Sequence, residues 1–298
     1  MTEDKKQIVG HVIACGTQIM WGATFVSTKV LLGVFSPVEV LMIRCLLAFL
    51  ALYLFYPHHL KVEEKKKELY FMGSALCGIV LYFMLENTAL TMTYASNVGI
   101  IVTCAPFFVA VIVSIFYKSE KPGKNFFLGF VIAISGVIMI SLNGQQSFHL
   151  NPLGDFLAFL AMITWGMYSA FMKRVSHWQY PMIAVTRRIY FYAIIFLIPV
   201  AAVQGVSLDV TRFYDVKIVG NFLFLGLCAS ALGFLLWNVA TKWIGAVKTS
   251  VYIYVSPIVT VFLSVLVLHE KLTMISVLGA ALILVGLYIS QQKKFLQG

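Results

Sequence analysis

Several charged side chains lie inside long apolar runs of the sequence, and three of them are candidates for a site. Glu86 lies near the end of the run 69–90, and Arg44 and Arg188 lie well inside two others. A charge at the centre of a bilayer costs about 2.5–3.5 kcal/mol on insertion scales, so such residues face a cavity, a partner or water. The carboxylate could bind a substrate amine or carry a proton coupled to transport. The alternative is a structural ion pair with an arginine.

The two arginines occupy matching places in the chain. Arg44 comes seven residues after Pro37, and Arg188 comes seven residues after Pro181. Because arginine keeps its charge in proteins, each needs a partner or water. Each could hold a substrate carboxylate or lock neighbouring helices together, and the presence of one in each half of the chain favours the lock. Arg187 has no such counterpart, and its long side chain could equally reach toward a membrane surface.

Aromatic and hydroxyl side chains recur at helical spacing near these charges. Thr17, Trp21, Thr24 and Thr28 lie on one face of a helix over 10–31. Each hydroxyl could simply bond a carbonyl of its own helix, but the aromatic set favours the wall of a cavity for a moderately apolar ligand. The candidates on the matching faces of later helices are Trp165, Tyr168, Tyr252 and Ser256.

Two stretches that join neighbouring apolar runs resemble each other. Residues 87–106 and 238–257 each begin with Asn, have Ala two and eight residues later, and end with Pro. A proline inside a membrane helix frees a carbonyl and kinks the helix, which is tolerated beside a cavity. Pro106 and Pro257 are therefore candidate gates, with static packing as the alternative. The same region supplies three further candidate substrate-binding residues, Asn87, Asn238 and Trp237, the last at the position that corresponds to Glu86.

The composition indicates the elements that hold these residues. Of the 298 residues, 60% are hydrophobic and 11% charged, and the mean hydropathy is +0.90. Soluble domains carry about 25% charged residues, so we expect an all-α integral membrane protein with little soluble structure. Spans need about 20 apolar residues each. We predict ten, at 10–31, 37–56, 69–90, 95–117, 125–142, 153–172, 180–203, 217–238, 248–268 and 273–290.

The net charge of +10 resides mainly in the short loops between these spans. With the N-terminus inside, fifteen of the 22 lysines and arginines fall on the inner side and four on the outer side. Basic loops face the cytoplasm in membrane proteins. We therefore expect both termini in the cytoplasm, and we attribute the positive charge to topology and not to nucleic-acid binding.

The sequence also repeats itself at a nearly constant offset. Trp21-Gly22 recurs as Trp165-Gly166, and the Pro and Arg described above recur at the same offset. The predicted halves are 10–142 and 153–290, with five spans each. Because five is odd, the second half must thread the membrane in the opposite sense. Such inverted repeats place the substrate site near the midplane between the halves.

These motifs resemble those of a known transporter family. The Trp-Gly pair of the first span, the P-x6-R of the second, the alanine-rich join before Pro106, and E-x8-G-x6-G before and within the fifth are similar to an EamA module. Two such modules form the ten-helix transporters of the drug/metabolite transporter superfamily. The resemblance implies export of amino acids, other small metabolites or drug-like compounds across the bacterial inner membrane. Glu86 and the double Arg187-Arg188 depart from the family pattern.

The function that we predict is alternating-access transport of a small metabolite, with an amino acid or related compound and export favoured. Protons are a candidate coupling ion. We expect no catalytic residues, no metal and no cofactor, because the chain lacks phosphate-binding glycine loops and paired metal-ligand motifs. An intramembrane enzyme and a multispan sensor remain as rivals. Gly129, Gly136, Gly279 and Gly286 permit close helix contact, and a homodimer through the fifth and tenth spans is open.

Overall fold

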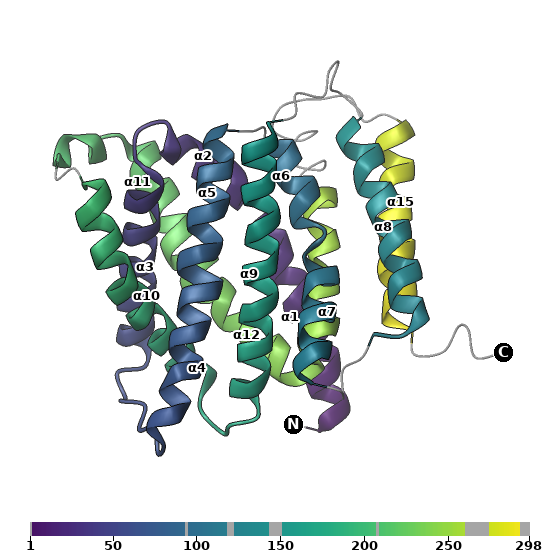
Figure 1. Ribbon diagram of the computed structural model, residues 1–298, viewed down its shortest axis with the longest axis horizontal. Coiled ribbons are helices and arrows are strands. Elements are labelled where there is room, and N and C mark those ends of the chain that lie inside the picture. The colour runs from purple at the N-terminus through teal and green to yellow at the C-terminus, as the bar shows by residue number, and fades with distance from the viewer. Residues whose placement is uncertain are drawn as a thin grey trace.

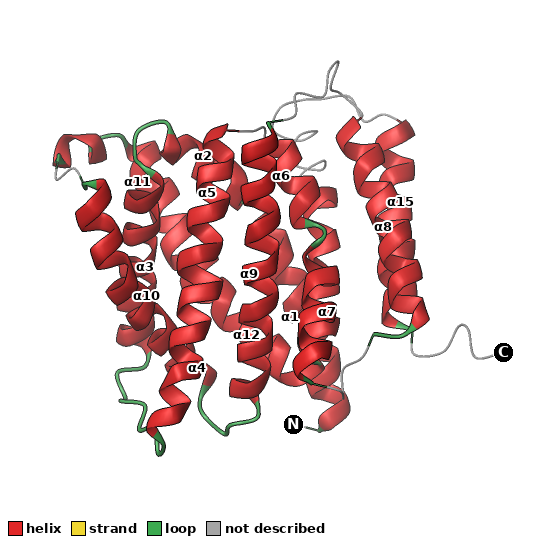
Figure 2. Ribbon diagram, in the orientation of Figure 1, coloured by secondary structure: helices red, strands yellow, loops and turns green. Residues whose placement is uncertain are grey.

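The computed structural model describes residues 2–92, 95–117, 122–142, 151–206, 209–259 and 274–292. Every regular element in these ranges is helical (Figure 2). Six of the helices are long and apolar enough to cross a membrane: Glu3–Leu32, Pro37–Phe55, Lys65–Met92, Pro152–Ser176, Met182–Gln204 and Val216–Ile244. Shorter apolar helices occupy the remaining predicted spans. The prediction of an all-α membrane fold is therefore confirmed, while the count of ten spans stays a prediction.

The helices stand side by side as an upright bundle (Figure 1). The first half contains α1 (Glu3–Gly22), α2 (Thr24–Leu32), α3 (Pro37–Phe55), α4 (Lys65–Ala75), η1 (Leu76–Leu81), α5 (Tyr82–Met92), α6 (Ala95–Val102), α7 (Ala105–Phe116) and α8 (Lys124–Leu142). The second half contains α9 (Pro152–Ser176), α10 (Met182–Gln204), η3 (Val210–Phe213), α11 (Val216–Leu223), η4 (Phe224–Leu232), α12 (Gly233–Ile244), α13 (Ala246–Ser250), η5 (Val251–Tyr254) and α15 (Met274–Gln291).

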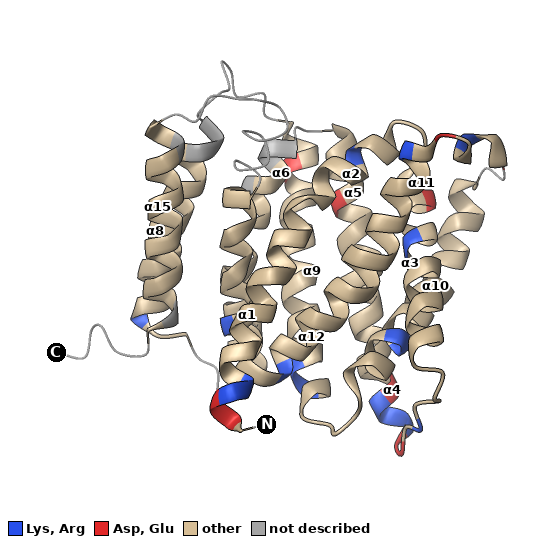
Figure 3. Ribbon diagram, turned by 180° about the vertical axis from the view of Figure 1, so that it is seen from behind, with Lys and Arg blue, Asp and Glu red and all other residues tan. Residues whose placement is uncertain are grey.

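Corresponding helices of the two halves run in opposite directions. α1 begins at the end of the bundle that holds the N-terminus, whereas α9, its counterpart by the Trp-Gly motif, begins at the other end (Figure 1). Lys and Arg residues gather at the end near the N-terminus, and fewer lie at the opposite end (Figure 3). Inverted repeats require corresponding helices to run in such opposite directions. The division into two repeat domains stays a prediction.

Sequence signals at the helix starts agree with the structure. Ser36 caps α3: its hydroxyl accepts a hydrogen bond from the Glu39 backbone, and the Glu39 carboxylate accepts one from the Ser36 backbone. Pro37 follows in the first turn, where its missing N–H costs nothing. Asn151 caps α9 in the same manner, by accepting from the Gly154 backbone N–H.

The third span of each half contains a π-helix, which the sequence did not reveal. η1 separates α4 from α5, and η4 separates α11 from α12. The wider turns of a π-helix turn side chains and carbonyls away from their α-helical directions and are frequent at functional sites. In η1, a side chain at Gly78 would collide with the Tyr168 ring of α9. Gly78 therefore lets the two halves approach closely.

The predicted gate prolines lie beside helix irregularities. The expected continuous span 95–117 is broken after α6, and Pro106 stands in the first turn of α7. Pro106 therefore starts a helix and does not kink one, because its ring tolerates the first turn but not the helix interior. Pro257 follows the 3-10 turn η5, among the helical residues 255–259 that end this described range. Whether either proline moves during transport stays a prediction.

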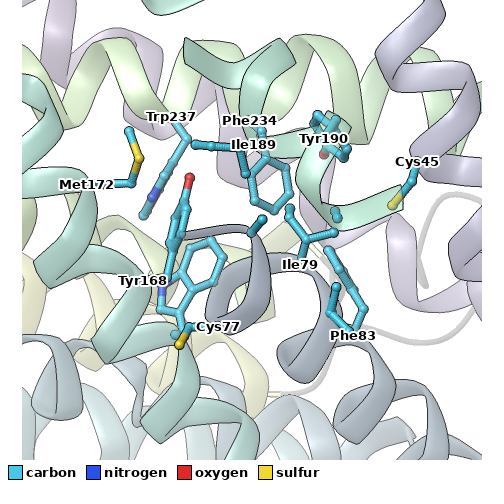
Figure 4. Packing of buried hydrophobic residues seen from close by; sticks show 14 of the residues in the cluster. Cys45, Cys77, Ile79, Phe83, Tyr168, Met172, Ile189, Tyr190, Phe234 and Trp237 are labelled. Carbon is cyan, nitrogen blue, oxygen red and sulfur yellow. The ribbon is translucent and has the colours of Figure 1, made fainter. Parts of the chain in front are cut away.

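The main core lies at the contact between the halves, where large apolar and aromatic side chains interlock. Figure 4 shows Tyr168 and Trp237 of the second half packed near Phe83 and Ile79 of the first, with Phe234 between them. All five side chains are buried. Such packing matters in a membrane, because lipid gives apolar helices no hydrophobic reason to associate.

α8 and α15 pack against each other at one side of the bundle (Figure 1). A side chain added at Gly129 would collide with the backbone of Gly286, and one added at Gly136 would collide with the backbone of Gly279. The glycines that were predicted to permit close helix contact therefore bring α8 and α15 together, whereas the homodimer stays a prediction. Glu120 and Glu270, which open the two E-x8-G-x6-G motifs, lie outside the described residues.

Candidate functional site

A cavity lies between the two halves, both of which supply lining residues. It encloses about 540 Å³ of empty space, including the part open to the surroundings. Six predicted site residues line it: Trp21, Thr24, Arg44, Glu86, Trp165 and Ser256. The remaining lining residues are Gln18, Phe25, Tyr82, Phe83, Val102, Ala105, Met162, Phe234 and Ile253.

The two Trp-Gly motifs meet at this cavity. The rings of Trp21 and Trp165 lie edge to face with centroids 5.8 Å apart. Trp21 Nε1 donates to the Ala229 carbonyl in η4 at 2.9 Å, whereas Trp165 Nε1 is buried without a partner. Phe234 packs against both rings, at 5.3 Å and 5.9 Å. The repeat thus builds an aromatic wall in which one indole is fixed and the other has a free donor.

Arg44 projects from α3 into the cavity wall. Its side chain is 3% exposed, and Nε donates to the Ser230 hydroxyl at 3.1 Å. Its guanidinium carbon lies 4.1 Å from the centre of the Phe83 ring, in a cation–π contact. Among the residues that the structure describes, no carboxylate oxygen lies within 4.0 Å of this guanidinium. Arg44 thus brings to the cavity a positive charge that no ion pair neutralises.

Glu86 lies on α5 at the same cavity. It is 6% exposed, and its Oε2 atom is buried without a hydrogen-bond partner. Tyr82, one helical turn earlier, interacts with the carboxylate through its hydroxyl, and Arg44 is close enough for an electrostatic attraction. The structure therefore places a carboxylate and a guanidinium around one cavity without joining them in a salt bridge. The alternative of a structural ion pair between them is not what this geometry shows.

Gln18 is a lining residue that the sequence reasoning missed. Its Oε1 atom accepts a hydrogen bond from the Ser256 hydroxyl at 2.7 Å, and its Nε2 atom is buried without a partner. The prediction placed Thr17 on the cavity face, but Thr17 donates to the Ile13 carbonyl of its own helix. The cavity lining from this region is Gln18, Trp21, Thr24 and Phe25, which includes two of the four residues on the predicted face. An amide inside an apolar run was the available signal.

Three predicted residues form a buried layer next to the cavity. The Tyr168 hydroxyl donates to Asn238 Oδ1 at 2.6 Å, and Asn238 Nδ2 donates to the Thr186 hydroxyl at 3.1 Å. Trp237 packs against Trp21, with ring centroids 5.1 Å apart. None of Tyr168, Asn238 and Trp237 lines the cavity itself. Their role in substrate binding stays a prediction, and their geometry shows support for the aromatic wall.

The other predicted residues lie away from the cavity lining. Asn87, the residue after Glu86, is buried, and its Nδ2 atom has no hydrogen-bond partner. The Tyr252 hydroxyl lies 2.8 Å from Nδ1 of His11, which links the first and ninth predicted spans. Arg188 pairs with Glu68 of α4 instead of facing the cavity. Direct substrate contact by these residues also stays a prediction.

Arg187, next to Arg188, has a structural position. Its guanidinium donates to the backbone carbonyls of Tyr56 and His58, at and just beyond the end of α3. A cation at a helix C-terminus satisfies carbonyls that lack partners in the helix and interacts favourably with its dipole. Arg187 therefore ties α10 to the end of α3 and is remote from the cavity lining.

The arrangement suits selective binding of a small ligand. The cavity is mostly apolar and aromatic, and it contains one positive group, one carboxylate and two free hydrogen-bond donors. Apolar walls with a few placed polar groups are typical of small-molecule sites. Both halves supply lining residues, so the candidate site is built by the repeat as a whole.

Comparison with known proteins agrees with this arrangement. The model of the EamA-like transporter family matches residues 8–142 and 152–291. The "Probable amino-acid metabolite efflux pump" of Escherichia coli (strain K12) is 27% identical over 94% of this chain and 93% of its own. An "Uncharacterized transporter" of Archaeoglobus fulgidus is 24% identical over 95% of this chain and 98% of its own.

A solved crystal structure shares the fold. It superposes with a TM-score of 0.74 at 14% identity, over 97% of each chain. At this identity the likeness concerns the fold alone. The apolar helices and the cavity between the halves agree with the two matched segments, which together span nearly the whole chain. The chain belongs to the EamA-like transporter family and is a multi-pass membrane protein.

Proposed function

We propose that the protein is a secondary transporter that exports an amino acid or a related small metabolite across the bacterial inner membrane by alternating access. One observation carries the proposal: Arg44 and Glu86 are buried at one cavity between the halves, and no salt bridge joins them. Isolated charges in a membrane are expensive. A ligand that carries both a carboxylate and an ammonium group would neutralise both side chains at once.

The aromatic wall supports the same substrate class. Trp21, Trp165 and Phe234 surround the charged groups with apolar surface, which accommodates the side chain of an amino acid. The name of the Escherichia coli relative, an amino-acid metabolite efflux pump, points to the same cargo and to export. The uneven distribution of basic residues supports cytoplasmic termini, and a transporter role is favoured over an intramembrane enzyme or a sensor.

Transport by purified protein in liposomes tests the proposal. Counterflow of each of the twenty radiolabelled amino acids is measured with and without a pH gradient. We expect wild type to accelerate counterflow of at least one of them. Glu86→Gln keeps the shape of the side chain but removes its charge, so it lowers the rate about 100-fold if the carboxylate holds the ammonium group. Absence of flux for every amino acid and related metabolite would sink the transporter proposal.

The pH dependence separates two roles of Glu86. If the carboxylate also carries the coupled proton, a pH gradient drives uptake into liposomes by wild type but not by Glu86→Gln. If it only binds the ammonium group, both proteins respond to the gradient in the same proportion. Rates that are equal in the two proteins at every pH would remove Glu86 from the mechanism.

Cysteine labelling in cells tests the orientation. A cysteine that replaces Lys66 should resist a membrane-impermeant maleimide in intact cells, and one that replaces Gly205 should react, because the predicted topology puts them on opposite sides. Both positions lie in or beside exposed connecting segments of the structure. The reverse pattern would invert the topology.

A further inference from the structure

Three buried polar atoms at the cavity lack hydrogen-bond partners. They are Nε2 of Gln18, Nε1 of Trp165 and Oε2 of Glu86. These three residues are 2%, 4% and 6% exposed, respectively. A buried polar group without a partner costs about 1–3 kcal/mol, and native structures retain few of them. Two of the three atoms are donors and one is an acceptor. A ligand that complements them offers acceptor oxygens to Gln18 and Trp165 and a donor to Glu86.

The orientation of Gln18 is set from the other half of the chain. The Ser256 hydroxyl donates to its Oε1 atom at 2.7 Å, which leaves Nε2 as the free end of the amide. The helices that carry the two residues are in close contact, because a side chain added at Gly22 would meet Val259 and approach the Ser256 carbonyl. The amide therefore has one fixed end and one end available to the cavity.

We propose that Gln18 is a specificity-determining residue that donates a hydrogen bond to the carboxylate of the transported molecule, and that Ser256 is its positioning residue. Trp165 Nε1 supplies a second neutral donor, and Arg44 supplies the positive charge. The inference rests on the proposed function, since it assigns how the same cavity recognises one end of its substrate. Gln18 adds directional selection that a charge alone does not give, because an amide donor requires an acceptor in a defined place.

The assignment predicts discrimination between a carboxylate and its ester. The probes are the amino acid with the fastest counterflow among the twenty and its methyl ester. In wild type, KM is lower for the acid than for the ester. Gln18→Ala should raise KM for the acid about tenfold, the value of a hydrogen bond to a charged group, and leave KM for the ester nearly unchanged. Little change in kcat is expected for either probe.

Two further substitutions keep the test informative if Gln18→Ala folds poorly. Gln18→Glu sets one carboxylate against another and should raise KM for the acid more than Gln18→Ala does, while the ester is affected less. Ser256→Ala leaves the amide free to rotate and should raise KM for the acid about threefold, and Ser256→Thr, which keeps the hydroxyl, should restore it. The matched controls are Gln7→Ala at the exposed start of α1 and Ser135→Ala on α8, whose hydroxyl bonds its own helix.

The outcomes separate this inference from the proposed function. If wild type transports an amino acid but the Gln18 variants change KM for acid and ester equally, or change neither, the assignment of Gln18 is wrong and the transporter proposal stands. Equal shifts are also the result expected if the amide binds only an ordered water. If wild type transports none of the amino acids, the proposed function fails first.

Discussion

Arg44 and Arg188 stand at equivalent positions of the two sequence repeats, yet their surroundings differ. Arg44 is 3% exposed at the cavity, where it contacts the Ser230 hydroxyl and the Phe83 ring. Arg188 lies outside the cavity lining, with its side chain 34% exposed, and forms an ion pair with Glu68. The Tyr192 hydroxyl donates to the same carboxylate at 2.7 Å. The charge of Arg44 has no carboxylate within 4.0 Å among the described residues, whereas the charge of Arg188 is already paired with that of Glu68.

The difference comes from the helix that each arginine meets. Arg44 reaches η4, which offers a hydroxyl, and Arg188 reaches the start of α4, which offers the carboxylate of Glu68. Arginines at equivalent positions can thus have different surroundings, because each contacts a different stretch of the facing span. The sequence repeat therefore predicts where each arginine stands in its span, but it does not predict what the side chain contacts. The difference in contacts favours a substrate role for Arg44 and the locking role for Arg188.

The largest effect is expected from removal of the charge on Arg44. Arg44→Met keeps a long side chain but no charge, so counterflow should fall about 100-fold or more if Arg44 binds a carboxylate. The melting temperature in detergent should stay within about 3 °C of wild type or rise, because a buried charge without an ion pair is replaced by an apolar group. Counterflow and a thermal melt measured on the same preparation check both parts.

The matched control is the same substitution at the equivalent position. Arg188→Met leaves Glu68 without its partner, so we expect a lower melting temperature and a transport rate within about fivefold of wild type. A large loss of stability in Arg44→Met with unchanged transport would reverse the two roles. The comparison between the arginines would then have to be abandoned.

A double-mutant cycle on Arg188 and Glu68 gives a smaller effect. Arg188→Met, Glu68→Gln and the double variant are compared by thermal unfolding. Because both side chains are partly exposed, we expect a coupling free energy of only about 0.5–1 kcal/mol. A coupling near zero would show that Tyr192 and water satisfy Glu68 equally well. In that result, Arg188 would no longer serve as the locked counterpart of Arg44.

Much of the fold and part of the site were predictable from the sequence. The apolar runs and the motifs at matching offsets indicated the membrane fold, and the charged residues within those runs indicated Arg44 and Glu86. These signals are strong because a charge or a repeated Trp-Gly pair is rare in a span and has few structural solutions. One cavity is lined by four residues that these signals indicated: Trp21, Arg44, Glu86 and Trp165.

Other features depend on contacts that the sequence does not encode locally. Both Thr17 and Gln18 are buried, so the pattern of polar residues on α1 could not decide which face meets the cavity. The π-helices η1 and η4 change the direction of side chains without a recognisable motif. The pairing of Arg188 with Glu68 joins residues 120 positions apart. Such choices are made by the packing of whole helices, after local preference has been satisfied.

The smallest effect on transport is expected from a third arginine, Arg212, which does not line the cavity. Arg212 of η3 pairs with Glu39 of α3 through two contacts, at 2.8 Å and 3.3 Å, and lies 4.3 Å above the Phe35 ring. The Glu39 carboxylate raises the pKa of Arg212. This pair also links the two halves, but neither residue lines the cavity. Its side chains are 18% and 6% exposed, so it extends the comparison from a buried arginine and a partly exposed pair to a more buried pair.

Arg212→Gln should lower the midpoint of unfolding, because it removes the charge that pairs with the buried Glu39 carboxylate, and the difference from wild type should change little with salt, since partly buried pairs are screened weakly. The measurement is chemical unfolding in detergent at low and high ionic strength. Transport by Arg212→Gln should equal that of wild type if the Arg212–Glu39 pair only stabilises the fold. A rate that rises while stability falls would instead show that the contact holds the halves in one state, since weakening a contact specific to that state shifts the population away from it.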